Sequence, residues 1–247
     1  MLSAENDDAM RWAGEAGQLL VNLRSTSESG RALGDAGDQL AHQHLMRRIS
    51  DRYPADRIRS EEADQTKKLG DQTGRVWIID PLDGTREYSE GRADWAVHVA
   101  LAIDGEPVVG AVALPSLDRV LGTGNPPPLA QPAAVPRMVV SRSRPPEFVP
   151  FVAEQLGATV VPMGSAGAKI AAVIQGNAEI YLHSGGQYEW DSAAPVAVAL
   201  ATGLVASRLD GSPLIYSQED PWLPDLIVVH PTLSASVTQA LRKFNGG

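Results

Sequence analysis

Two aspartates stand three residues apart at the end of an apolar run, in the segment IIDPLDGT at residues 78–85. Asp80 and Asp83 supply carboxylate oxygens, and a turn between them can aim the Leu82 carbonyl at the same point. Pro81 fixes the direction in which the chain leaves the run. Because Mg²⁺ takes oxygen ligands in near-octahedral geometry at about 2.0–2.1 Å, the segment indicates a site for a hard cation. The alternative is a strand-to-turn cap, in which aspartate serves only the turn.

Three other acidic positions offer the same chemistry from distant parts of the chain. Glu61 lies in the run RIRSEE, Asp191 directly precedes an expected helix of small residues, and Asp38 ends the run LGDAGD. Each also has a plain structural interpretation: a solvated corner for Glu61, and a helix N-cap for Asp191 and Asp38. For Asp38 a base beside the metal site is the other interpretation. Carboxylates crowded together without cations repel one another and take up protons, so a shared site would favour metal binding over a structural role.

The composition narrows the class of protein. The chain of 247 residues is 43% hydrophobic and contains no cysteine, which excludes disulfides, thiolate metal sites and a cysteine nucleophile. Its formal net charge of -9 argues against a nucleic-acid polymer as partner, since phosphate backbones need clustered lysine and arginine. A phosphorylated small molecule remains compatible, because bound divalent cations would supply local positive charge. The acidic N-terminus lacks signal-peptide features and no apolar stretch approaches the roughly 20 residues that span a bilayer, so we expect a cytoplasmic enzyme without stable membrane association.

Apolar spacing predicts two helices and a set of strands in the first half of the chain. Apolar residues recur every three or four positions in the helical segments, and the Asp104-Gly105 dipeptide is typical of a hairpin turn between two strands. The expected helices cover residues 8–23 and 38–52, and the expected strands cover residues 76–79, 95–103, 108–114 and 119–121.

A proline-rich segment, NPPPLAQPAAVP at residues 125–136, predicts a stiff connector between two α/β halves, residues 1–124 and 137–247. We expect the first half to carry most of the metal ligands and the second half to carry Asp191 and the substrate contacts. Helices and strands alternate in the second half too, which implies layered α/β halves and an α/β (α+β) fold class. Its expected strands cover residues 138–140, 179–183 and 226–229, and its expected helices cover residues 146–156, 166–175, 193–201 and 232–244.

Taken together, three ordered motifs resemble those of the inositol-monophosphatase superfamily: SEE at 60–62, DPLDGT at 80–85 and EWDSAAP at 189–195. The resemblance covers nearly the whole chain and implies a layered αβαβα sugar-phosphatase fold. Within the superfamily the chain looks most like the CysQ-type 3'(2'),5'-bisphosphate nucleotidases, especially the actinobacterial form. Four details carry that likeness: Ser60 before the glutamate pair, the run Arg86–Tyr88 after DGT, the run Ser141–Arg144, and Glu189 before Trp190 and Asp191.

The resemblance implies a role for each motif residue. Asp38 and Thr85 resemble the pair that orients and deprotonates the attacking water. The implied metal ligands, for two or three Mg²⁺ ions, are Glu61, Asp80, the Leu82 carbonyl, Asp83 and Asp191. The implied substrate contacts are Glu61, Asp83, Gly84, Thr85, Ser141, Arg142, Ser165, Lys169 and Asp191.

Two positions depart from the pattern that the family usually has. Around Asp38 the family often reads Val-Thr-x-x-Asp, whereas this chain reads LGDAGD at residues 33–38. Nucleotide-binding members often place a lysine three residues after a serine, whereas Ser165 and Lys169 are four apart. The first departure affects the water-activating role that the resemblance assigns to Asp38. The second affects the phosphate contact that it assigns to Lys169.

The implied activity is hydrolysis of 3'-phosphoadenosine 5'-phosphate to AMP and phosphate, with lithium as an inhibitor and a homodimer as a possible assembly. Two cations about 3.5–4 Å apart can hold both the attacking and the leaving oxygen of such a displacement. The nearest alternative is a related phosphatase acting on inositol phosphate or fructose 1,6-bisphosphate. Further alternatives are a non-catalytic metal-binding homologue, which would have lost Asp38 or Thr85, and a two-metal exonuclease, which the acidic charge disfavours.

Overall fold

The computed structural model describes residues 2–26, 29–63 and 73–246, and a five-stranded sheet dominates its first half. The strands lie in the order β1-β2-β3-β4-β5; β1 is parallel to β2 and every other pair is antiparallel. The elements of this half are α1 (Ser3–Thr26), α2 (Arg31–Arg52), β1 (Arg57–Ser60), β2 (Arg75–Asp83), α3 (Thr85–Ser89), β3 (Ala96–Ile103), β4 (Glu106–Leu114), the 3-10 turn η1 (Pro115–Leu117) and β5 (Arg119–Gly122).

A second five-stranded sheet, in the order β7-β6-β8-β10-β9, forms the other half. Segment 126–136 leads into it and contains no helix or strand. The elements of this half are β6 (Arg137–Ser141), α4 (Val149–Leu156), β7 (Thr159–Met163), α5 (Ala166–Ile174), β8 (Ile180–Tyr188), α6 (Glu189–Thr202), β9 (Val205–Ser207), β10 (Trp222–Val229), η2 (Pro231–Leu233) and α7 (Ser234–Asn245).

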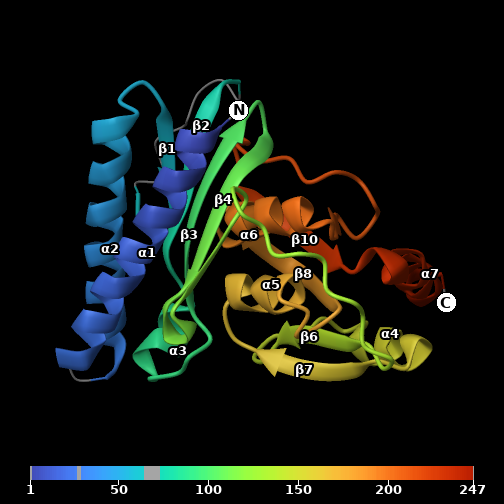
Figure 1. Ribbon diagram of the computed structural model, residues 1–247. Coiled ribbons are helices and arrows are strands. Elements are labelled where there is room, and N and C mark those ends of the chain that lie inside the picture. The colour runs from blue at the N-terminus through green and yellow to red at the C-terminus, as the bar shows by residue number, and fades with distance from the viewer. Residues whose placement is uncertain (1, 27–28, 64–72, 247) are drawn as a thin grey trace.

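Helices separate and flank the two sheets, so the chain stacks in five layers (Figure 1). Helices α1 and α2 cover the outer face of the first sheet, α5 and α6 lie between the sheets, and α4 and α7 cover the far face of the second. This is the αβαβα order that the sequence resemblance implied, and the expected fold class is confirmed. Among the described helices, none combines the length and apolarity that a membrane crossing requires.

Strand β2 is buried on both faces, and its alternating side chains pack into two different hydrophobic cores. Trp77 and Ile79 pack with α1 and α2, whereas Val76 and Ile78 face the central layer with α5 and α6. Neighbouring β3 presents alanines to the central layer, including Ala100, so that α6 can lie close to the sheet. The metal-site motifs on β2 and α6 are thereby brought to one place.

Several predicted helix starts were wrong. Helix α1 begins at Ser3 rather than at residue 8, and α4 begins at Val149 rather than at residue 146. Helix α2 begins at Arg31 rather than at residue 38, so Asp38 lies inside the helix and is not its N-cap. Gly34 and Gly37 look like helix breakers in sequence, but they serve close packing. A Cβ at Gly34 would stand 2.8 Å from Thr85 Cγ2, and one at Gly37 would stand 3.1 Å from side-chain atoms of Leu20, Leu82 and Tyr88.

Helix α6 likewise begins at Glu189, four residues before the predicted start. The helix continues through Pro195. Strand β2 also runs further than predicted, through Pro81 to Asp83. Elements α3, β7 and β9 were not predicted from the sequence.

Candidate active site

Asp80 and Asp83 project to the same side of β2 because the strand is bulged between them. Residues three apart in a regular strand point to opposite faces. Here the pairing with β3 shifts from Asp80↔His98 to Asp83↔Ala96, which places one extra residue on β2. The Leu82 backbone N–H donates to Asp80 Oδ1 at 3.0 Å within this bulge. The sequence DPLD therefore turns two carboxylates that a flat strand would separate toward one point.

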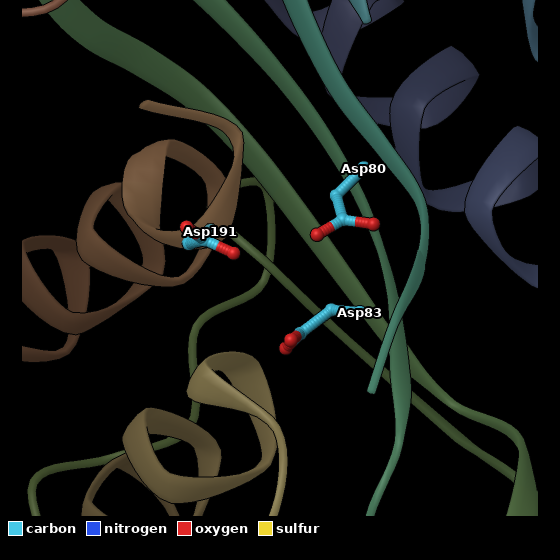
Figure 2. Close-up of side chains that lie close together, drawn as sticks. All are labelled: Asp80, Asp83 and Asp191. Atoms are coloured by element: carbon cyan, nitrogen blue, oxygen red, sulfur yellow. The ribbon is translucent and has the colours of Figure 1, made fainter. Parts of the chain in front are cut away.

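Asp191 joins this pair from the first turn of α6. One carboxylate oxygen from each of Asp80, Asp83 and Asp191 lies within 4.8 Å of the others. Figure 2 shows the three side chains turned toward one another from β2 and α6. Asp191 also closes a capping box, since its Oδ2 accepts the backbone N–H of the N-cap residue Tyr188 at 2.6 Å. The capping role and a place in the acidic cluster are thus compatible, although the cap residue itself is Tyr188.

Glu61 directly follows β1 and reaches the cluster from the neighbouring strand. The Glu61 backbone N–H donates to Ile79 O at 3.3 Å, which continues the parallel pairing past the end of β1. Its carboxyl lies within hydrogen-bonding reach of the Asp80 carboxyl. Asp80 Oδ2 is buried, and no donor of the described residues reaches it. All four carboxylates expected at a metal site therefore lie together.

Asp38 and Thr85 meet beside this cluster. The Thr85 hydroxyl lies 3.3 Å from Asp38 Oδ1 and 3.1 Å from the Leu82 carbonyl oxygen, so its single proton can be given to either acceptor. Asp38 is 8% exposed. Gly84 carries the turn before Thr85 with φ 88°, a left-handed conformation that favours glycine. The contact between α2 and this turn depends on the glycines of α2 described above.

Asp83 also accepts hydrogen bonds from the start of α5, a role that was not predicted from the sequence. Its carboxylate accepts the backbone N–H of Ala166 at 3.1 Å, the backbone N–H of Gly167 at 2.5 Å and the Ser165 hydroxyl. These donors form the start of α5, where backbone N–H groups lack helical partners and favour negative charge. Asp83 thus joins the first sheet to the second half of the chain, and the Ser165 hydroxyl, expected to contact substrate, donates to Asp83.

An open cavity of about 820 Å³ lies over the cluster. Lys169, buried in its wall, donates from Nζ to the backbone carbonyls of Gly164 and Ser165. Arg142, at its edge, pairs with Glu87 at 2.7 Å and with Glu90 at 3.0 Å. Of the expected substrate contacts, the lining includes Asp83, Gly84, Ser141, Arg142, Ser165, Lys169 and Asp191.

The profile of the Inositol monophosphatase family matches residues 9–243. The chain belongs to this family. A relative from Mycobacterium tuberculosis, named 3'-phosphoadenosine 5'-phosphate phosphatase, is 47% identical over 245 residues, which cover 92% of this chain and 91% of the relative. The 3'(2'),5'-bisphosphate nucleotidase CysQ of Escherichia coli is 28% identical over 199 residues, which cover 76% of this chain and 81% of that protein.

Solved structures of the family share the fold. CysQ from Bacteroides thetaiotaomicron superposes with a TM-score of 0.81 at 24% identity, covering 92% of this chain and 97% of that one. Inositol monophosphatase II from Staphylococcus aureus gives a TM-score of 0.81 at 20% identity, covering 95% of this chain and 94% of that one. The layered architecture is therefore that of the family.

The electrostatics of the cluster fit a divalent cation. Burial raises the pKa of Glu61 to about 7 and the pKa of Asp191 to about 7, and neighbouring carboxylates add to both shifts. Burial, followed by the charges of Glu61, Asp83 and Asp191, raises the pKa of Asp80 well above its ordinary value. A nearby cation would lower these pKa values and favour the carboxylate forms. Hard oxygen donors suit an ion such as Mg²⁺, and so does Asp80 Oδ2, which has no hydrogen-bond partner among the described residues.

A buried ion pair behind the cluster was also missed from the sequence. Arg59 on β1 pairs with Glu189 on α6 at 2.6 Å, and the two side chains are 6% and 0% exposed. Arg59 also donates to the Gln218 carbonyl. Arg59 lies two residues before Glu61, and Glu189 lies two residues before Asp191. The pair therefore fixes the strand and the helix that carry these two acids, and Glu189 before Trp190 was its only signal in the sequence.

The raised pKa values predict that stabilisation by Mg²⁺ depends on pH. Glu61 and Asp191 bind protons more tightly in the folded than in the unfolded chain, so the metal-free protein loses stability as pH rises from about 4 to about 7. Mg²⁺ competes with those protons. We expect the gain in Tm on adding MgCl₂ to be near zero at pH 5.5 and several degrees at pH 8, measured calorimetrically. NaCl at matched ionic strength is the control, and an equal gain at both pH values would contradict the assignment.

Proposed function

We propose that the protein is a magnesium-dependent phosphatase that removes the 3'-phosphate of 3'-phosphoadenosine 5'-phosphate, releasing AMP. The observation that carries the proposal is the convergence of Asp80, Asp83 and Asp191, with Glu61 beside them, beneath a cavity of about 820 Å³. Cavities of about 300–1,000 Å³ suit ligands of nucleotide size. The name and the 47% identity of the mycobacterial relative support this substrate.

The proposed ligands for two or three Mg²⁺ ions are Glu61, Asp80, the Leu82 carbonyl, Asp83 and Asp191. When bound, such ions lower the pKa of a water molecule and neutralise charge on the leaving oxygen. Phosphate ester hydrolysis is among the slowest uncatalysed reactions in water, so this electrostatic contribution is the largest that the site has to supply.

Asp38 and Thr85 are proposed to handle the proton of the attacking water. Burial, together with the charge of Glu62, raises the pKa of Asp38 to about 7, near the value that suits a general base at neutral pH. The Thr85 hydroxyl lies between Asp38 Oδ1 and the Leu82 carbonyl. A water held at this point would give its proton to Asp38 while its oxygen attacks phosphorus. The bond from phosphorus to the 3' oxygen breaks, and the leaving 3' oxygen takes a proton from solvent. The Thr85 hydroxyl keeps the Asp38 carboxylate oriented.

Substrate contacts are proposed around the cavity. The backbone N–H groups of Gly84 and Thr85 are proposed to hold the transferred phosphate. Ser141, Arg142 and Lys169 contribute to holding the second phosphate, since arginine suits bidentate phosphate binding. Arg142 would exchange part of its pairing with Glu87 for the ligand.

Phosphate release from three substrates, with and without Mg²⁺, tests the proposal. We expect kcat/KM for 3'-phosphoadenosine 5'-phosphate to exceed those for inositol 1-phosphate and fructose 1,6-bisphosphate by about tenfold or more, with no turnover after chelation of divalent ions. A single-stranded oligonucleotide serves as the control for exonuclease activity and should not be degraded. A preference for either base-free substrate would overturn the nucleotide assignment, whereas turnover in chelator would overturn the metal dependence.

A further inference from the structure

Gln187 presents an unpaired amide at the wall of the cavity. Its side chain is 7% exposed, yet neither Nε2 nor Oε1 finds a hydrogen-bond partner among the described residues. Buried polar groups in proteins are almost always hydrogen-bonded, so such an orphan needs an explanation. Gln187 belongs to the lining of the same cavity that holds Asp83 and Asp191, which places its amide where a bound ligand can satisfy it.

Two exposed aromatic rings stand on the same part of the wall. Trp222 on β10 and Tyr188 on β8 are register partners, both line the cavity, and their exposed fractions are 48% and 46%. The other four tryptophans of the chain are at most 3% exposed. Flat aromatic surfaces open to solvent beside a polar cavity are suited to stacking against the face of a nucleobase.

The strand end that carries Gln187 and Tyr188 adjoins the acidic cluster. The Tyr188 backbone N–H donates directly to the Asp191 carboxylate, so the strand end that carries Gln187 and Tyr188 abuts the proposed metal site. A ligand whose phosphate lies at Asp191 can therefore extend its base along this strand end.

We propose that Gln187, Trp222 and Tyr188 form a nucleobase subsite that selects adenine. The inference rests on the proposed function and names the part of the chain that recognises the base. An amide offers one acceptor and one donor side by side, which matches N6–H₂ and N7 of adenine. Guanine presents two acceptors, O6 and N7, at that edge and leaves the amide oxygen unmatched.

Steady-state kinetics of matched variants test the subsite. Gln187→Met keeps the size of the side chain and removes the amide, and we expect kcat/KM for 3'-phosphoadenosine 5'-phosphate to fall by about tenfold. The inhibition constant of inorganic phosphate, which has no base, should stay within about twofold. The Tm should not fall, because the lost amide has no hydrogen-bond partner within residues 2–26, 29–63 and 73–246. Wild-type protein should also prefer adenosine over guanosine 3',5'-bisphosphate by about tenfold, a preference that Gln187→Met abolishes.

Stacking is tested separately by tryptophan fluorescence. AMP should quench the solvent-exposed emission of Trp222, whereas ribose 5-phosphate, which is AMP without its base, should not. Trp222→Phe keeps a ring and should retain most of the affinity for AMP, whereas Trp222→Ala should weaken it by about tenfold.

Equal quenching by both ligands, or unchanged kinetics in Gln187→Met alongside normal wild-type turnover, would overturn the subsite and leave the proposed function standing. If the wild-type protein did not turn over the nucleotide, the proposed function itself would be refuted.

Discussion

Asp80→Asn is expected to lower kcat by about 10³-fold or more and, at the same time, to raise the Tm of the metal-free protein. Loss of one charged residue from the proposed ligands would remove several kcal/mol of cation-derived stabilisation of the transition state, and each 1.36 kcal/mol is tenfold in rate. The stability gain has a separate cause. Asp80 is 1% exposed, Oδ2 has no donor among the described residues, and three other acids raise its pKa. An amide at this position carries no charge and relieves that repulsion.

Asp83→Asn is the matched control, with the same loss of activity and the opposite change in Tm. Asp83 accepts hydrogen bonds from Ser165, Ala166 and Gly167 at the start of α5. An asparagine there loses the charge that the helix start favours and turns an NH₂ group toward donors. Calorimetry without divalent ions and phosphate release with Mg²⁺ would measure both effects. Normal turnover in either variant would refute the metal-ligand assignment, and equal Tm changes would refute the separation of roles.

The sequence was sufficient to predict which acids gather, because each belongs to a motif with its own chemistry. DPLDGT joins the aspartates of β2 to a turn, and EWDSAAP places Asp191 at the start of a helix. The means by which they gather could not be predicted. The β-bulge that turns Asp80 and Asp83 to one side depends on the register with β3, which is a pairing between distant segments.

Two contacts between the halves of the chain were likewise beyond sequence reasoning. Arg59 and Glu189, which form an ion pair, are 130 residues apart in the sequence. The sequence around each of them does not identify the other as its partner. The hydrogen bonds from α5 to Asp83 depend on how the second sheet packs against the first. Such contacts arise from tertiary packing, whereas apolar periodicity reports only local structure.

Most helices and strands followed from apolar spacing, which locates a helix better than it locates the residue where the helix begins. Helices α1, α2 and α6 all begin several residues before their predicted starts. In α2 the glycines are needed because the turn at Thr85 packs directly on the helix. The error in α2 therefore lies at the active site, where packing demands overrule local preference. The hairpin at Asp104-Gly105 was confirmed, since Ile103 pairs with Glu106 across it.

Asp38→Asn is expected to lower kcat by about 10²–10⁴-fold while the gain in Tm on adding Mg²⁺ at pH 8 stays as in the wild-type protein. A general base contributes an acceleration of about that size, and Asp38 is proposed to take a proton rather than to bind a cation. The acid limb of the rate–pH profile, measured at saturating Mg²⁺, should also become shallower, because Asp38 no longer titrates while Glu61 and Asp191 still do. If Mg²⁺ no longer stabilised the variant, Asp38 would be a ligand and not the base.

Thr85→Val removes the hydroxyl with little change in volume and tests whether the two residues act as one unit. The Thr85 hydroxyl lies 3.3 Å from Asp38 Oδ1, so either substitution alone disrupts the same proton path. We therefore expect the double variant to be no slower than the slower single variant, because effects of residues that act together are not additive. If the fold losses in kcat of the two single variants multiplied in the double variant, Thr85 and Asp38 would act on separate steps. Comparing the single and double variants thus decides whether Asp38 and Thr85 act as a pair or Asp38 acts alone beside the proposed metal ligands.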